Sequence, residues 1–313
     1  MRIAVMAAGA VGGYFGARLA QAGHEVAFVA RGRQLEALRA DGLRVESALG
    51  DMQLPSVEAT GEPAKVGPVD LVLFSVKLWD TLEAAEAIKP LLGAGTAVVS
   101  FQNGVVKDDI LRQALGAGHV IGGVCYIAAT VAEPGIIRHS GTIQKLVFGE
   151  YDGSPSPRVR QFRDACAGSG IDAEISDRIE QAIWEKFVFL VGLSGTTGLA
   201  RSPIGPIRDH PRSRAFLRDV MEEVVRVARA QGVPLPADYA DERLAFTDTL
   251  PATMTSSMHH DLENGNRLEV PWLSGDVVER GARLGVPTPC NRAIFDILSI
   301  YSAGRSSAPR ASA

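Results

Sequence analysis

Two glycines near the start of the chain, Gly9 and Gly12, have a spacing that suits the binding of a diphosphate. They occur in IAVMAAGAVGGYFG, after a short apolar run and before a helical pattern. In the G-x-G-x-x-G pattern the second glycine lets the backbone approach a pyrophosphate, and the third allows a helix to pack closely on a strand. The free N–H groups and the dipole at the helix N-terminus favour anions. This context predicts a dinucleotide cofactor held by four residues: Gly9, Ala10, Val11 and Gly12.

Alanine stands at position 7, where the pattern has its first glycine. That glycine serves the tight turn between strand and helix. Alanine has the smallest side chain after glycine and can take this place if its φ is negative, so we expect a negative φ at Ala7. The alternative is a glycine-rich turn that binds nothing.

The end of the second predicted strand indicates which dinucleotide is bound. An enzyme that uses NAD usually has Asp or Glu there for the ribose 2′-hydroxyl. This chain has Ala30, followed by Arg31 and Arg33. A guanidinium suits a 2′-phosphate by its charge and its fork of donors, which favours NADP and assigns Arg31 to it. Two solvated surface arginines are the alternative.

Polar residues also follow two later strands, as SVK at 75–77 and FQNG at 101–104. In an open α/β sheet, ligands bind outside the carboxyl ends of the strands. Lys77 and Asn103 are therefore expected to face the cofactor. Each is otherwise a turn residue, because Asn-Gly is a common turn dipeptide.

The elements that must position these loops alternate between strand and helix. Apolar runs predict strands at 2–7, 24–32, 70–77, 96–104 and 119–129, and 3.6-residue periodicity predicts helices at 11–23, 80–92 and 105–115. Residues 135–150 are predicted to form a hairpin around Gly141, followed by a helix at 156–170 and a strand at 171–176. The order predicts a doubly wound Rossmann-type α/β domain over residues 1–177.

After residue 177 the pattern becomes almost wholly helical. Helices are predicted at 179–200, 210–232, 238–248, 270–284 and 289–301, which form an all-α domain over residues 178–303, and residues 304–313 are a predicted disordered tail. Lys186 lies within a strongly apolar helix, where a lysine usually extends to the surface. Ser257, Asp261 and Glu269 occupy a polar segment that, taken alone, predicts a solvated loop and a helix N-cap.

Composition limits the classes of function. The chain has 313 residues, a net charge of −4 and three cysteines, Cys125, Cys166 and Cys290, which form no C-x-x-C. The mildly acidic balance disfavours nucleic acid as a partner, and the isolated cysteines disfavour a zinc site and suit a reducing cytoplasm. The sequence has no apolar run long enough for a membrane span.

Together these motifs resemble the ketopantoate reductase (2-dehydropantoate 2-reductase) family. The matching pieces occur in the family's order over nearly the whole chain: GAVGG at 9–13, VKxxD at 76–80, QNG at 102–104, WxK at 184–186, SSMxxDxxxG at 256–265, LEV at 268–270 and PTP at 287–289. The resemblance implies NADPH-dependent reduction of ketopantoate to pantoate, and a C-terminal domain like that of 6-phosphogluconate dehydrogenase.

The resemblance also implies a role for each matching residue. Lys186 would be the general acid that protonates the keto oxygen, and Glu269 would hold Lys186 or a substrate hydroxyl. Ser257 would help to hold the substrate carboxylate. Asn103 and Lys77 would lie where nicotinamide and substrate meet. An ammonium within hydrogen-bond reach of the oxygen would stabilise the charge that develops when hydride reaches the ketone carbon.

The chain departs from the family four and eight residues after the lysine. The family often has asparagines there, whereas this chain has Leu190 and Ser194. Leucine cannot hydrogen-bond a substrate hydroxyl, and serine can do so only with a shorter reach. A more apolar, branched or aromatic 2-keto acid is therefore an alternative substrate.

Two other enzyme classes are alternatives. A D-2-hydroxyacid dehydrogenase and a β-hydroxyacid or 6-phosphogluconate type dehydrogenase have the same order of domains, although the SSMxxD segment favours a ketopantoate reductase. A non-catalytic NADP-binding regulator is the alternative outside enzymes, and the intact Lys186 and Glu269 count against it. A homodimer is expected by analogy.

Overall fold

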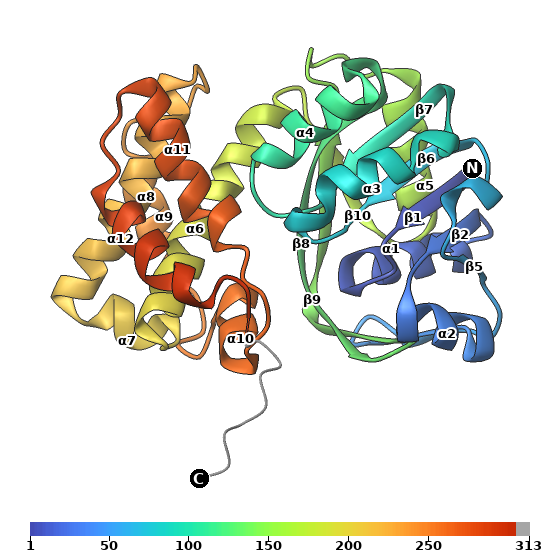
Figure 1. Ribbon diagram of the computed structural model, residues 1–313, viewed down its shortest axis with the longest axis horizontal. Coiled ribbons are helices and arrows are strands. Elements are labelled where there is room, and N and C mark those ends of the chain that lie inside the picture. Colours follow the sequence, from blue (N-terminus) through green and yellow to red (C-terminus); the bar gives the residue numbers. More distant parts are fainter. Residues whose placement is uncertain (305–313) are drawn as a thin grey trace, which may run out of the picture. The chain divides into compact units, whose positions relative to one another are not determined.

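The computed structural model describes residues 1–304 and divides into two compact units (Figure 1), Met1–Ile183 and Trp184–Ala313. The predicted boundary between residues 177 and 178 lies six residues before this division. The predicted disordered tail at 304–313 lies, apart from Gly304, outside the described residues. Among residues 1–304 no helix combines the length and the apolar character that crossing a membrane requires.

The first unit is built on one sheet with the strand order β4-β3-β9-β8-β7-β6-β1-β2-β5, and β10 pairs with β9. Neighbours from β5 to β8 are parallel, while β8 and β9 pair antiparallel, as do β3 and β4. The strands are β1 (Arg2–Met6), β2 (Glu25–Val29), β3 (Leu43–Ser47), β4 (Met52–Leu54), β5 (Glu58–Thr60), β6 (Val69–Phe74), β7 (Leu92–Ser100), β8 (Val120–Glu133), β9 (Ile136–Gly149) and β10 (Asp172–Ile175).

Helices cover both faces of this sheet, which confirms the doubly wound prediction. Successive residues of a strand point to opposite faces. Ile3 and Val5 of β1 join one apolar cluster with residues of α1 and α5, whereas Ala4 joins a second cluster with residues of α3 and α4. The helices of the unit are α1 (Ala10–Gln21), α2 (Gly32–Asp41), α3 (Thr81–Ala87), α4 (Val106–Leu115) and α5 (Pro157–Gly168).

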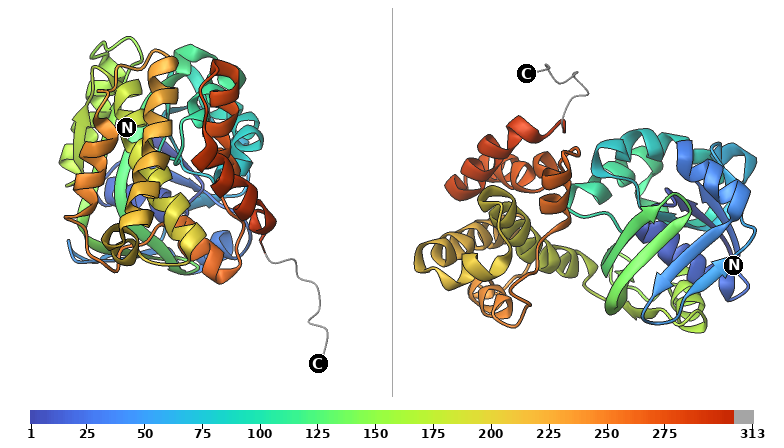
Figure 2. Two further views of the ribbon diagram at one scale, coloured as in Figure 1. Left: turned by 90° about the vertical axis from the view of Figure 1, so that its left-hand side faces the viewer. Right: turned by 90° about the horizontal axis from the view of Figure 1, so that it is seen from below.

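The predicted hairpin around Gly141 is wrong. β8 and β9 are single long strands (Figure 2), and the chain turns between them at residues 134–135, where Gly135 has a φ of 79°. Gly141 has a φ of 75° inside β9, at a bulge where the register shifts between Ile127 and Ala129 of the partner strand. A positive φ suits a bulge as well as a turn, so the glycine alone did not distinguish them.

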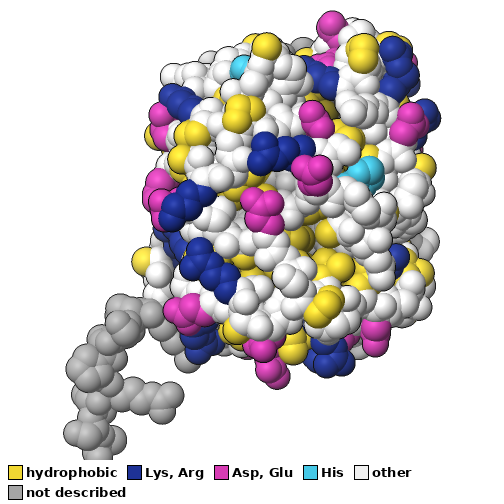
Figure 3. Space-filling view, turned by 90° about the vertical axis from the view of Figure 1, so that its right-hand side faces the viewer, with side chains coloured by type: hydrophobic (Ala, Val, Ile, Leu, Met, Phe, Trp, Pro, Cys, Tyr) yellow, Lys and Arg dark blue, Asp and Glu magenta, His cyan; other side chains and the backbone are white. Residues whose placement is uncertain are grey.

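Charged side chains of both signs are interspersed over one face of the first unit, which Figure 3 shows. This is the ordinary pattern of a solvated protein surface. Two elements near this face are β5 and, apart from its first residue, α2; both lie within residues 33–60, for which no helix or strand was predicted.

The described regular elements of the second unit are all helical (Figure 2). Two glycines of α6 let neighbouring helices approach closely. A Cβ at Gly192 would overlap Met221, and one at Gly195 would overlap Ile294. The helices are α6 (Ile179–Ala200), α7 (Ile204–Asp209), α8 (Pro211–Ala230), α9 (Tyr239–Thr247), α10 (Ser257–Asn264), α11 (Ser274–Leu284) and α12 (Pro289–Leu298).

Candidate functional site

The carboxyl ends of three parallel strands bring the predicted loops of the first unit together. The residue after β6 is joined to the last residue of β1 by a hydrogen bond from Ser75 N to Met6 O (3.0 Å). The residue after β7 is joined in the same way to the last residue of β6, by a hydrogen bond from Phe101 N to Phe74 O (3.0 Å). The glycine loop, the SVK segment and the FQNG segment therefore lie side by side within this unit. This is the edge at which open α/β sheets bind ligands.

The glycine loop has the geometry that a pyrophosphate requires. Helix α1 begins at Ala10, and its N-cap residue Gly9 gives it no side-chain cap. A Cβ at Gly12 would overlap Ala7 O and Ser75 Oγ, so this glycine is needed for helix–strand packing. A Cβ at Gly9 would meet nothing within 4 Å. The space beside Gly9 and the uncapped N–H groups of the first turn fit a dinucleotide phosphate.

Ala7 departs from its predicted conformation. Its φ is 73°, in the left-handed region, so the expectation of a negative φ is wrong. The tight turn keeps the conformation that glycine would adopt, because two hydrogen bonds hold it. Ala7 N and Ala8 N both donate to Val29 O, at 3.2 and 3.1 Å. For an L-residue this conformation costs about 1–2 kcal/mol.

We expect Ala7→Gly to raise the free energy of unfolding by about 0.5–1 kcal/mol. Glycine removes the strain at the positive φ, and its greater freedom in the unfolded chain offsets part of the gain. Urea denaturation measures the change. Ala8→Gly is the matched control, because Ala8 is buried at an ordinary φ and its replacement should destabilise the protein. An equal decrease in the free energy of unfolding for both variants would contradict the assignment of strain to Ala7.

Two side chains that the sequence did not single out hold the glycine loop from outside. The Ser75 hydroxyl donates to Ala7 O (3.1 Å) and to Met6 O (3.3 Å). Gln34 Nε2 donates to Ala8 O (2.8 Å), and Gln34 Oε1 accepts from Gly135 N (3.0 Å). Gln34 thus links the loop to the turn between β8 and β9.

Arg31 lies at the start of α2, two residues after the end of β2. It is the N-cap residue of the helix, and its side chain is 75% exposed. One guanidinium N–H donates to Asp80 Oδ2 at 2.5 Å. Arg33 is also exposed, in the first turn of the same helix. Lys77 is exposed, with its Nζ 5.6 Å from the centre of the Trp79 ring.

Asn103 lies half-buried in a turn that is fixed from both sides. Before it, Gln102 Nε2 donates to Thr81 Oγ1 (2.8 Å). After it, Lys107 of α4 is 1% exposed, and its Nζ donates to Ser100 O (3.1 Å) and to Asp108 Oδ2 (2.8 Å).

Tyr151 forms a buried cluster with Lys107 and Asp108. The Tyr151 hydroxyl donates to Asp108 Oδ2 at 2.8 Å. Burial, and after it the Asp108 carboxylate, raise the pKa of Tyr151, so the phenol keeps its proton and remains a donor. The burial of Lys107 could not be predicted from the sequence, because α4 is otherwise an ordinary amphipathic helix.

In the second unit, Lys186, Leu190 and Ser194 lie one turn apart along α6 and therefore share a face. Lys186 and Leu190 are half-buried. Ser194 is 1% exposed, and its hydroxyl has no hydrogen-bond partner among residues 1–304. One turn further, Thr197 Oγ1 lies 3.2 Å from Ser256 Oγ.

The polar segment that contains Ser257 forms α10. The buried Ser256, rather than Ser257, caps this helix and accepts a hydrogen bond from His259 N (3.1 Å). Ser257 is the first residue of the helix and is exposed. Burial lowers the pKa of His259, which keeps that imidazole neutral at neutral pH. Glu269 is 7% exposed and directly precedes a short 3-10 helix at Val270–Trp272.

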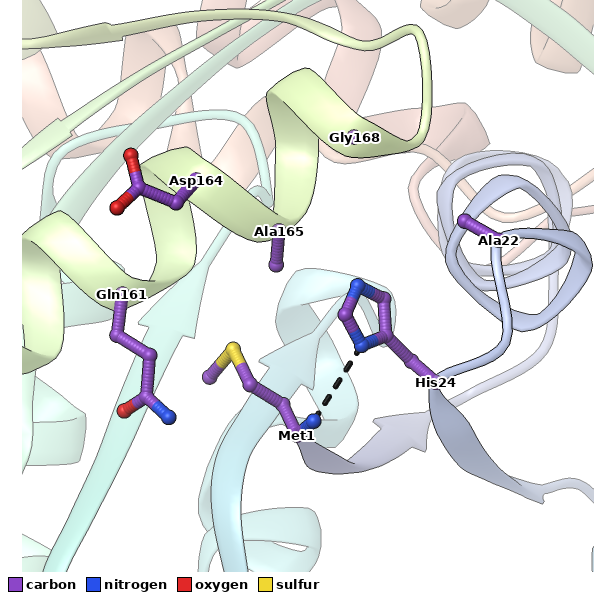
Figure 4. A pocket seen from close by; sticks show the side chains of 7 residues that line it. All are labelled: Met1, Ala22, His24, Gln161, Asp164, Ala165 and Gly168. Atoms are coloured by element: carbon purple, nitrogen blue, oxygen red, sulfur yellow. Dashed lines mark hydrogen bonds between the residues drawn. The ribbon is translucent and has the colours of Figure 1, made fainter.

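A separate pocket of about 360 Å³ lies at the opposite edge of the sheet, before the first residues of β1 and β2 (Figure 4). Met1 and His24 contribute to it, with the Met1 amino nitrogen 3.3 Å from His24 Nδ1, and Gln161 and Asp164 reach it from α5. Because ligands of such sheets bind at the carboxyl ends of the strands, we do not assign the cofactor to this pocket.

Comparisons with known proteins identify the family of the chain. The family model described as Ketopantoate reductase PanE/ApbA matches residues 3–153, and the model of its C-terminal part matches residues 178–302. The chain is 31% identical to the uncharacterized oxidoreductase YkpB of Bacillus subtilis over 97% of this chain and 99% of that protein. It is 32% identical to a 2-dehydropantoate 2-reductase of Halobacterium salinarum, over 96% and 98%.

A solved structure shows the same fold throughout. The PanE/ApbA family ketopantoate reductase of Ralstonia eutropha JMP134 aligns with a TM-score of 0.88 and 38% identity, over 96% of this chain and 98% of that one. The chain therefore belongs to the ketopantoate reductase family and is an oxidoreductase.

Proposed function

We propose that the protein reduces the keto group of a 2-keto acid to a hydroxyl group with NADPH, with Lys186 as the proton donor. The observation that carries this proposal is the half-buried lysine on a strongly apolar helix, two turns before a buried serine hydroxyl that has no hydrogen-bond partner among residues 1–304. A lysine and a hydroxyl two turns apart on one helix face can bind different polar groups of one small substrate.

On the cofactor side, the proposal rests on the glycine loop and the arginines. The N–H groups of the first turn of α1 would bind the pyrophosphate, with Gly9 leaving room for it. Arg31 and Arg33 would bind the 2′-phosphate. When bound, NADPH supplies the hydride that reduces the keto carbon. Lys77 and Asn103 would bind where the nicotinamide and the substrate meet.

On the substrate side, Lys186 Nζ would donate a hydrogen bond to the keto oxygen and then transfer a proton to it. This contact is strongest when negative charge develops on the oxygen, so it lowers the barrier rather than only the substrate affinity. Glu269 would hold Lys186 or a substrate hydroxyl, and Ser257 and Ser194 would bind the polar groups of the acid. The direct test is NADPH oxidation with a panel of 2-keto acids.

Two substrates compete within this proposal. The family favours ketopantoate, whose hydroxyl needs a hydrogen-bond partner. Leu190 favours an apolar branched or aromatic 2-keto acid, because it lies half-buried one turn after Lys186 and offers no polar atom. In that case the protein would act as a D-2-hydroxyacid dehydrogenase.

Leu190→Asn separates the two substrates. We compare kcat/KM for ketopantoate with kcat/KM for trimethylpyruvate, which is ketopantoate without its hydroxyl. An apolar site discriminates weakly between them, whereas an asparagine left without a partner penalises the analogue. The variant should shift the ratio toward ketopantoate by about 10-fold or more. Leu190→Met, which stays apolar, should leave the ratio within about twofold. An equal ratio in all three proteins would exclude Leu190 from the substrate site.

A further inference from the structure

The arginine assigned to the 2′-phosphate is already paired with an acid. Arg31 donates to Asp80 Oδ2 at 2.5 Å, and the two side chains are 75% and 23% exposed. The two residues are 49 positions apart in the chain. Arg31 ends the loop after β2, and Asp80 comes from the connection between β6 and α3.

Asp80 is held in position by the backbone around it. Asp80 N donates to Lys77 O (2.9 Å), which closes the 3-10 turn at Leu78–Asp80. The Thr81 hydroxyl donates to Leu78 O (2.7 Å) and fixes the same turn. Asp80 is the N-cap residue of α3, yet its side chain makes no capping hydrogen bond to that helix. Its carboxylate is directed to Arg31 instead.

We propose that Asp80 sets the cofactor preference of the protein by competing with the 2′-phosphate of NADPH for Arg31. This inference rests on the proposed use of a nicotinamide dinucleotide. The carboxylate neutralises the guanidinium and repels a phosphate that approaches it. The same carboxylate can accept a hydrogen bond from the ribose 2′-hydroxyl of NADH. It thereby supplies, from another loop, the acid that Ala30 lacks at the end of β2.

The consequence is a protein that binds both cofactors with similar affinity. Arg31 and Arg33 favour NADPH, and Asp80 reduces that advantage and favours NADH. Because the pair is exposed, the repulsion between Asp80 and the phosphate is moderate and depends on salt. We expect Asp80→Asn to bind NADPH about 5- to 10-fold more tightly than the unmodified protein does, since charges a few ångströms apart at a surface interact on that scale.

The test measures the Kd of NADPH and of NADH by calorimetric titration, without substrate. For Asp80→Asn we expect the Kd of NADPH to fall by about 5- to 10-fold, and the Kd of NADH to stay unchanged or to rise. Glu83→Gln is the matched control: this exposed carboxylate lies in the first turn of α3 and should alter neither Kd. Arg31→Ala should raise the Kd of NADPH and leave the Kd of NADH unchanged. A thermal unfolding curve for each variant verifies that it is folded.

The outcomes separate this inference from the proposed function. If the unmodified protein binds neither cofactor, the proposed function itself is wrong. The other outcome is that the unmodified protein binds NADPH, but Asp80→Asn has the same ratio of the two Kd values as the unmodified protein, or binds both cofactors more weakly by the same factor. Asp80 then does not select the cofactor, and the inference is overturned.

Discussion

Replacement of Lys186 by alanine is expected to lower kcat by about 10²- to 10⁴-fold, the range that general acid catalysis supplies. The loss arises because no other group then donates a proton to the developing alkoxide in the proposed reaction. The Kd of NADPH should stay nearly unchanged, because the residues assigned to the cofactor all lie in the first unit. Steady-state reduction of the best 2-keto acid and a titration with NADPH measure the two quantities.

Two controls make this result specific. Lys186→Arg keeps the positive charge but is a poor proton donor, so its kcat should also fall strongly. A small primary amine added to Lys186→Ala should restore part of the activity, in proportion to its concentration. Normal turnover in Lys186→Ala would refute the role of the lysine, and a loss that no amine restores would assign it to positioning alone.

Lys107→Met is expected to lower the free energy of unfolding by about 3–5 kcal/mol, because it leaves the buried Asp108 carboxylate without its cation. Lys107 and Asp108 are 1% and 5% exposed, and the ammonium also holds Ser100 O and Gly123 O (3.2 Å). Loss of these contacts should loosen the turn that carries Asn103. Urea denaturation measures the change in stability.

The exposed ion pair of Lys65 and Glu62 provides the control. Lys65 Nζ lies 2.6 Å from Glu62 Oε1, and both side chains are largely exposed to water. Lys65→Met should cost less than about 1 kcal/mol. Lys107→Met combined with Asp108→Asn should recover part of the lost stability, because the amide removes the buried unpaired charge and its oxygen still accepts from the Tyr151 hydroxyl. A cost for Lys107→Met no larger than that for Lys65→Met would contradict the account of the buried cluster.

Local patterns predicted the parts of the site that depend on local physics. The spacing of Gly9 and Gly12 identified the loop, because close packing and phosphate approach each require a missing side chain at one position. The order of strands placed SVK and FQNG at one edge of the sheet. The same reasoning failed at Gly141, where a turn and a bulge both use a positive φ, and at Ala7, where hydrogen bonds to Val29 O impose a conformation that alanine disfavours.

The remaining contacts join residues that are far apart in the chain. Ser75 meets the backbone of Ala7, Gln34 meets Gly135, and Asp80 meets Arg31. Each of these polar side chains also suits a solvated turn or helix, so the sequence does not reveal its partner until the fold is known. The buried position of Lys107 belongs to the same class, because its acceptors lie on β7 and β8.

The proposed reaction transfers hydride from a nicotinamide to the keto carbon of a 2-keto acid. Mass spectrometry of the product formed with NADPH that carries deuterium at both positions of nicotinamide C4 tests it most directly. If hydride passes from nicotinamide C4 to the keto carbon, the product is a 2-hydroxy acid with one deuterium on carbon 2. A protein that binds NADPH yet forms no deuterated hydroxy acid from any 2-keto acid of the panel would contradict it.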